Sequence, residues 1–219
     1  MATKAAAKRA VKPPLDREAF VEAALRLASS QNTVSLTFRE LGNEMGVDPT
    51  AIYRYFRNKE SLMQELLDRV FLMAIERLET PTGQWQECLQ EFAERTLDVF
   101  MEHPAIAASA TSLTTSGQGE LDSIELMLTC FSNAGLQGRA LAEQYAIFGS
   151  YVLSGAAGLA VDQVESSDPD STAWFSGPLL ADPRTTPLAN SIREEILDLD
   201  HREVFLSGVR QIIQAARQR

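Results

Sequence analysis

Residues 37–56 hold two helix-start signals separated by a turn that contains glycine, and this segment restricts the fold more than any other part of the 219-residue chain. Thr37 and Glu40 have the spacing of a capping box, so a helix is predicted to begin at Thr37. Gly46 can adopt the left-handed conformation that ends a helix. Asp48, followed by proline, predicts the start of the next helix. Two helices joined by a tight turn within about 20 residues indicate a helix-turn-helix unit.

The remainder of the chain also has a helical period. Apolar residues predict a first helix from Asp16 to about Asn32, a helix capped by Asn58, and one long helix over residues 138–165. A strand-like alternation of apolar and polar residues is not present in the sequence. The expected fold class is therefore all-α.

The charge of the chain is distributed unevenly. The formal net charge is −10, but residues 1–69 hold 11 basic and 9 acidic side chains, which leaves the rest of the chain at −12. A mildly basic N-terminal part on an acidic body indicates that a polyanionic partner such as DNA would meet the N-terminal part.

Cysteine and histidine usage argues against metal and redox chemistry. Cys88 and Cys130 are far apart in the sequence, as are the two histidines, so neither a disulfide framework nor a zinc site is predicted, and we expect no cofactor.

The N-terminus lacks the apolar core of a signal peptide, which favours a cytoplasmic location. The uncharged stretch 144–161 includes glycine, serine and glutamine, so we expect a buried or dimeric helix face there and no membrane contact.

The second helix of the helix-turn-helix unit is predicted to present a face suited to the major groove. Small groups at its start permit close approach to bases, Arg54 can bond guanine, and Tyr53 and Lys59 can hold phosphates. The exposed residues expected on this helix are Pro49, Thr50, Ala51, Tyr53, Arg54 and Tyr55.

Over residues 36–42, 45–47 and 51–62 the chain resembles the tetracycline-repressor (TetR) family of bacterial transcriptional regulators, and the resemblance extends over about residues 16–66. It implies that Thr37, Tyr53 and Lys59 clamp phosphates. It also implies that Arg39, Pro49, Thr50, Ala51 and Tyr55 face bases. The sequence departs from the family pattern at residues 31–32, where a glycine is frequent, at Gly42, where alanine is common, and at Tyr55, where histidine is frequent.

The resemblance implies the domain organisation and the partners. We expect a flexible basic arm over residues 1–14, a three-helix DNA-binding domain over residues 15–60, and a helical effector-binding and dimerisation domain over residues 61–219. Family members bind palindromic double-stranded DNA as homodimers and release it when a small molecule occupies the C-terminal domain.

Two sets of C-terminal residues are candidates for these roles. Small residues spaced by four, together with an apolar stripe near the C-terminus, suggest a dimer interface of Ser150, Ser154, Ala157, Gly158, Val161, Phe205, Gly208, Val209 and Ile212; an intramolecular core is the alternative. Aromatic residues with a few polar groups suggest an effector pocket of Phe92, Thr96, Phe100, His103, Met127, Phe131, Tyr145, Phe148 and Tyr151, with ordinary core packing as the alternative for each. Trp174 and Phe175 are expected either to cover the pocket or to pack on a partner subunit.

The predicted function is that of a repressor released from its operator by a small apolar or aromatic ligand. The alternative within the same class is a DNA-binding regulator without a small-molecule effector, acting as an activator or responding to a protein. An enzyme is not expected, since the sequence has no glycine-rich phosphate loop and no nucleophile elbow.

Overall fold

The computed structural model describes residues 15–30, 34–165 and 181–217, and these residues form helices, turns and loops without a strand. The predicted basic arm and the pair Trp174 and Phe175 lie outside the described residues. The elements are α1 (Arg17–Ser30), α2 (Phe38–Met45), η1 (Pro49–Arg54), α3 (Lys59–Glu76), α4 (Trp85–Glu102), α5 (Pro104–Ala107), α6 (Gln118–Asn133), α7 (Gly138–Glu165), α8 (Pro187–Ser191), α9 (Arg193–Leu197) and α10 (His201–Ala216).

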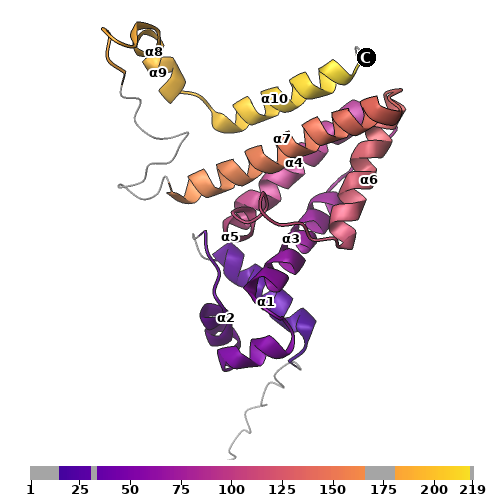
Figure 1. The fold of residues 1–219 in the computed structure, drawn as a ribbon, viewed down its shortest axis with the longest axis vertical. Helices are drawn as coiled ribbons and strands as arrows, with labels where there is room; N and C mark the ends of the chain where they lie inside the picture. Colours follow the sequence, from indigo (N-terminus) through magenta and orange to yellow (C-terminus); the bar gives the residue numbers. More distant parts are fainter. Residues whose placement is uncertain (1–14, 31–33, 166–180, 218–219) are drawn as a thin grey trace, which may run out of the picture.

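The N-terminal unit is a small helical head at one end of the molecule (Figure 1). Its α1, α2 and η1 pack around Phe20, Leu41 and Ile52, each of which is fully buried. Arg17 fastens α1 to the following elements, because its guanidinium bonds the Tyr55 carbonyl at 2.7 Å and lies over the Phe56 ring. The head is thus held together by apolar contacts and by bridging cations, since Arg69 of α3 also pairs with Glu18 of α1 at 2.6 Å.

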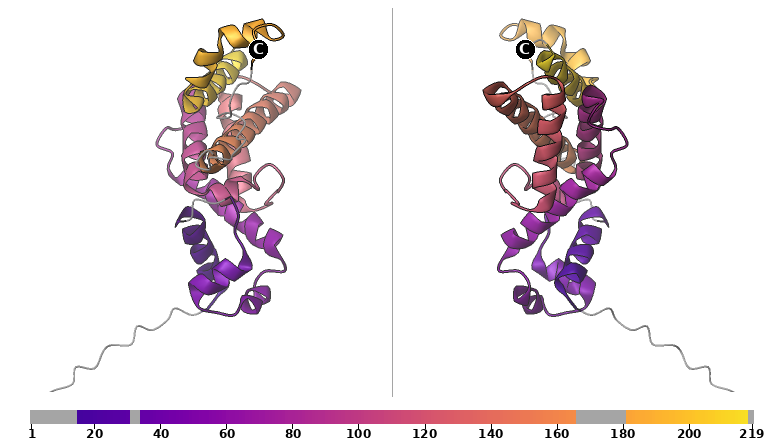
Figure 2. Two further views of the ribbon diagram at one scale, coloured as in Figure 1. Left: turned by 90° about the vertical axis from the view of Figure 1, so that its left-hand side faces the viewer. Right: turned by 90° about the vertical axis from the view of Figure 1, so that its right-hand side faces the viewer.

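The C-terminal part is a bundle in which α7 packs against α4, α5, α6 and α10 (Figures 1 and 2). Helix α3 belongs to both parts, since it packs on α1 in the head and on α4 and α6 in the bundle. The domain boundary predicted after residue 60 therefore falls inside one continuous helix. Helices α8 and α9 project from the bundle, and each has a large exposed apolar side chain, Leu188 and Leu197.

Helix α7 is the one described helix that is long and apolar enough to cross a membrane by length and composition. Its buried residues include Phe148, Val152, Ala156 and Ala160, which face the other helices of the bundle. Packing in the bundle accounts for part of the apolar character of α7, since 33% of its apolar window is buried.

Most predicted helix ends are confirmed, and the differences are local. Gly46 ends α2 with φ of 64°, and the long helix over residues 138–165 is observed with those bounds. The segment after Asp48 is a 3₁₀-helix of six residues, where a short α-helix was expected. The helix that follows His103 is short, ending at Ala107, and turns follow it.

Candidate nucleic-acid interface and effector cavity

The start of α2 is fixed by the predicted capping box. The Glu40 amide donates to the Thr37 hydroxyl at 3.2 Å, and the Thr37 amide donates to the Glu40 carboxylate at 2.8 Å. The hydrogen bond from the Thr37 hydroxyl lowers the pKa of Glu40, and the positive charges of Arg39 and Lys59 lower it further. Both cations therefore lie close enough to the cap to act on it, although Lys59 belongs to α3.

The turn between α2 and η1 depends on close packing at Gly42. A Cβ atom at this position would lie 3.0 Å from the Val47 carbonyl oxygen and 3.2 Å from the Pro49 ring. The Val47 amide also donates to the Gly42 carbonyl at 2.9 Å. Glycine here, where the related family commonly has alanine, permits α2 and η1 to approach closely and turns Pro49 partly inward.

Helix η1 is capped by Asp48, which accepts hydrogen bonds from the Thr50 amide at 2.8 Å and from the Thr50 hydroxyl at 2.6 Å. The hydroxyl bond is the main cause of the lowered pKa of Asp48. The proton of the Thr50 hydroxyl is used in this cap, so toward a ligand this hydroxyl offers a lone pair and its methyl group.

Tyr53 is the large aromatic residue that the head exposes. Its side chain is 60% exposed, and its ring meets the Phe38 ring edge to face with centroids 5.1 Å apart. Phe38 is itself only partly buried against the core. Tyr53 is thus supported from behind while its hydroxyl stays accessible, as a phosphate contact requires.

Tyr55 does not join Tyr53 on the exposed face. Its hydroxyl donates to the Leu15 carbonyl at 2.6 Å, and its ring packs on Phe20 with centroids 5.1 Å apart. The predicted base contact therefore needs correction, because Tyr55 connects η1 to α1 and is half-buried there.

The exposed side chains of the head comprise the predicted Thr37, Arg39, Thr50, Tyr53, Arg54 and Lys59, whereas Pro49 and Ala51 are half-buried. Arg57, next to η1, is also exposed but was missing from the predicted site, although it is part of the recognised motif. Arg57 lies one residue before the Asn58 cap, in a basic segment, and this position could have predicted that it belongs to the site.

A cavity of about 370 Å³ opens in the bundle between α3, α4, α6, α7 and the loop before α6. Its walls are mostly apolar, with several hydroxyl groups and one carboxylate. The lining residues are Phe71, Phe92, Thr96, Ala110, Thr111, Leu113, Thr114, Glu120, Ser123, Ile124, Met127, Tyr145, Ala146, Gly149, Ser150, Val152 and Leu153.

The structure brings four of the nine predicted pocket residues to this cavity: Phe92, Thr96, Met127 and Tyr145. The other five lie elsewhere. Phe100, Phe131 and Phe148 are fully buried in the core, His103 is buried at the junction of α4 and α5, and Tyr151 stacks on Phe205. The prediction missed Phe71 and the loop residues because the apolar pattern of one helix does not show which other segments pack beside it.

Much of the predicted dimer set packs within the subunit. Phe205, Val209 and Ala157 are buried, and the Tyr151 hydroxyl occupies the space beside Gly208 where a side chain would project. Ile212 is half-buried, and its carbonyl accepts from Gln144 on α7 at 2.9 Å. These residues belong to an intramolecular core, which was the alternative to a dimer interface, because α10 packs on α7 of the same chain. Ser150 lines the cavity of the bundle.

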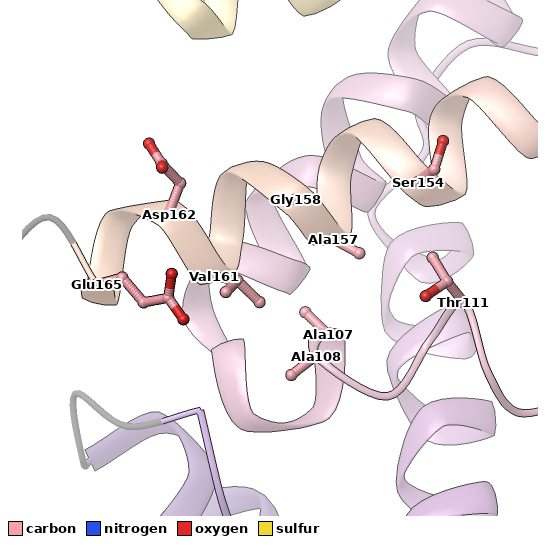
Figure 3. Close-up of a pocket in the computed structure, with 9 residues that line it drawn as sticks. All are labelled: Ala107, Ala108, Thr111, Ser154, Ala157, Gly158, Val161, Asp162 and Glu165. Carbon is pink, nitrogen blue, oxygen red and sulfur yellow. The ribbon is translucent and has the colours of Figure 1, made fainter. Parts of the chain in front are cut away.

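Two hollows flank the exposed part of α7. One, of about 290 Å³, lies between α5 and α7, and Figure 3 shows Ala107 and Ala108 below Ala157 and Val161. The other, of about 550 Å³, lies between α7 and the start of α10 and is lined by Ser154, Gly158, Leu199 and Val204 among others. Ser154 and Gly158 of the predicted dimer set line both hollows, and Val161 lines the first.

The structure thus defines a helix-turn-helix protein with a cavity-containing helical bundle, and the comparisons with known proteins agree. Residues 20–66 match the profile of bacterial regulatory proteins of the tetR family, and residues 79–215 match that of the tetracyclin repressor-like C-terminal domain. The chain belongs to the TetR family of transcriptional regulators.

Individual relatives are distant. The chain is 28% identical to the HTH-type transcriptional repressor DrrR1 of Streptomyces coeruleorubidus over 148 residues, which is 68% of this chain and 55% of DrrR1. It is 22% identical to the class D tetracycline repressor protein of Escherichia coli over 91% of this chain and 88% of that one. The chain thus aligns with only about half of the length of DrrR1.

The fold is that of the Streptomyces coelicolor TetR family protein ActR. Apo ActR superposes with a TM-score of 0.74 at 20% identity over 94% of this chain and 98% of that chain. ActR in complex with actinorhodin superposes with a TM-score of 0.73 at 20% identity, over 93% and 96% of the two chains. DrrR1 and the class D protein are repressors by name, and the chain is a DNA-binding transcriptional regulator.

Proposed function

We propose that this regulator is a cytoplasmic repressor that binds a palindromic operator as a homodimer and leaves it when a small apolar or aromatic molecule enters the bundle cavity. One observation carries the proposal: helix α3 reaches both sites. Its first residue, Lys59, is exposed beside the α2 cap, and Phe71 on the same helix lines the cavity. The two positions are about 18 Å apart along a helix of 1.5 Å rise per residue.

The contact set proposed for DNA is Thr37, Arg39, Thr50, Tyr53, Arg54, Arg57 and Lys59. Thr37, Tyr53 and Lys59 contact phosphates, and Arg39 and Arg54 read base edges. Pro49 and Ala51, being half-buried, contribute by allowing close approach of η1 to the groove.

The loop before α6 ties the cavity to α3. The Asp68 carboxylate of α3 accepts a hydrogen bond from the Glu120 amide at 3.0 Å, and the Gln64 side chain of α3 donates to the Thr114 carbonyl at 2.9 Å. Thr114 and Glu120 line the cavity. A ligand that displaces this loop therefore moves α3, and with it Lys59 and the head. The ligand favours the protein shape that it binds better, so DNA affinity falls.

A homodimer is required to read a palindrome, since each head presents one reading face. The exposed apolar residues Ile147, Leu199 and Val204, together with Ser154 and Gly158, support the outer surface of α7 and the start of α10 as the interface. The open cavity supports an effector over the alternative of a regulator without one. ActR, which was crystallised with actinorhodin, supports it further.

The test is selection of the purified protein against a randomised duplex library, combined with sedimentation of the complex and titration with salt. We expect a palindromic motif with half-sites about 34 to 36 Å apart, bound by two subunits. A folded protein that enriches no motif, or that binds a single half-site as a monomer, would contradict the proposal.

A further inference from the structure

The polar groups of the effector cavity restrict the charge of its ligand. Of the residues that line it, Glu120 is the one with a carboxyl group, and none is lysine, arginine or histidine. The cavity is otherwise walled by aromatic and aliphatic side chains such as Phe71, Phe92 and Met127. Any charged group of a ligand would therefore meet one negative charge and no positive one.

The buried hydroxyl groups of the cavity have already used their protons. The Thr96 hydroxyl donates to the Phe92 carbonyl at 2.8 Å, and the Ser123 hydroxyl donates to the Gly119 carbonyl at 2.8 Å. A hydroxyl has a single proton, so each can only accept a further hydrogen bond. These two buried groups call for a ligand that donates.

Glu120 is held in a fixed position by the loop. One carboxylate oxygen, Oε2, accepts hydrogen bonds from the Thr115 amide and the Ser116 amide, both at 2.7 Å. The other oxygen, Oε1, has no hydrogen-bond partner among the residues that the structure describes, and no described cation pairs with Glu120 or with neighbouring Asp68. The cavity therefore contains a positioned carboxylate with an available acceptor.

From these contacts we infer that the effector is an apolar or aromatic amine that is protonated at neutral pH, bound with its ammonium group at Glu120. The inference rests on the proposed effector role of the cavity and adds the charge class of the ligand. An ammonium donates hydrogen bonds to Glu120 and to the two buried hydroxyls, and it supplies the positive charge that no lining residue carries. A carboxylate or phosphate would be desolvated beside Glu120 without a partner.

The experiment uses three probes of one shape and different charge: naphthylmethylamine, naphthylmethanol and naphthoate. Binding of each to the full-length protein is measured by calorimetry at about pH 7. We expect the amine to bind about tenfold or more tightly than naphthoate, with the alcohol between them. Glu120→Gln should remove the advantage of the amine, whereas Glu125→Gln, on an exposed position of the same helix, should leave it unchanged.

A second variant locates the binding. Ala146 is exposed at the rim of the cavity, so Ala146→Trp should weaken binding of all three probes alike. Naphthoate binding as tightly as the amine, an amine preference that survives Glu120→Gln, or no binding by the amine would overturn the inference. Selection on duplex DNA with the same protein separates the two proposals. If a DNA motif is recovered but the amine does not bind, the DNA proposal stands and the charge inference fails. If the amine binds but no DNA motif is recovered, the charge inference stands and the DNA proposal fails.

Discussion

The head and the bundle are both helical, but different kinds of contact position their functional residues. In the head, Thr37, Asp48 and Asn58 each cap the start of a helix through bonds to residues two or three positions away. In the bundle, the cavity walls come from α3, α4, α6, α7 and a loop, and residues such as Phe71 and Leu153 are far apart in sequence. Local signals thus determine one site, and long-range packing determines the other.

The largest expected effect is on the core beside the cavity. Phe131 is fully buried and meets the Phe148 ring edge to face at 5.6 Å, so Phe131→Ala should lower the free energy of unfolding by about 3 to 5 kcal/mol. Urea unfolding followed by circular dichroism measures it. Leu121→Ala, at a position 54% exposed on the same helix, is the matched control and should change stability by less than about 0.5 kcal/mol. Equal losses in the two variants would contradict the assignment of Phe131 to the packed core.

The sequence predicted the head better than the bundle, because the head depends on local signals and the bundle on long-range packing. The capping box at Thr37 and the turn at Gly46 depend on neighbouring residues, so helix boundaries and the exposure of Tyr53 could be predicted. Tyr55 was misplaced because its inward direction depends on Phe20 and Leu15, which lie on another segment.

In the bundle, a helical stripe shows which face is buried but does not show what covers it. Phe92 and Phe100 lie on one stripe of α4, yet Phe92 lines the cavity and Phe100 packs in the core. Small residues on α7 and α10 predicted close approach of another helix, but the approach at Gly208 of α10 is made by Tyr151 on α7 of the same chain. Only the relative placement of whole helices separates these cases.

The two tyrosines of the head provide the second prediction. Tyr53→Ala should weaken binding to all duplexes by about tenfold, because a phosphate contact is independent of sequence. Tyr55→Phe should leave DNA affinity unchanged, since it removes only the bond to the Leu15 carbonyl. Both are measured by fluorescence anisotropy on a labelled duplex. The distinction between the two residues fails if Tyr55→Phe has the larger effect or if Tyr53→Ala changes preference among sequences.

The third prediction concerns Thr37, which caps α2 and is also a proposed phosphate contact. Thr37→Ala removes the acceptor for the Glu40 amide and should destabilise the protein by about 1 kcal/mol. Thr37→Ser keeps the acceptor and should restore most of that stability, measured by thermal unfolding. A Thr37→Ala protein as stable as the parent would show that the capping box contributes little to the head.

The smallest effect is expected where the two regions meet. His103 ends α4 and begins α5, which packs on α1, α3 and α7. Burial lowers the pKa of His103; the negative charge of Glu102 opposes this shift, and the positive charge of Arg77 adds to it. Neither ring nitrogen has a hydrogen-bond partner among the described residues. The neutral imidazole is therefore the form that fits the folded protein.

The sign of the pH dependence follows from this depressed pKa. The unfolded chain takes up the His103 proton at a higher pH than the folded chain does, so the stability from neutral His103 is present above the ordinary histidine pKa and is lost as the pH falls below it. Thermal unfolding between about pH 7.5 and 5.5 should show a falling Tm that is shallower in His103→Leu. His201→Gln removes the other histidine of the chain and serves as the control, which should retain the slope of the parent. If Tm depended on pH equally in His103→Leu and in the parent, the junction of head and bundle would accommodate a charged imidazole. The two regions would then be joined less tightly than the buried contacts of α5 indicate.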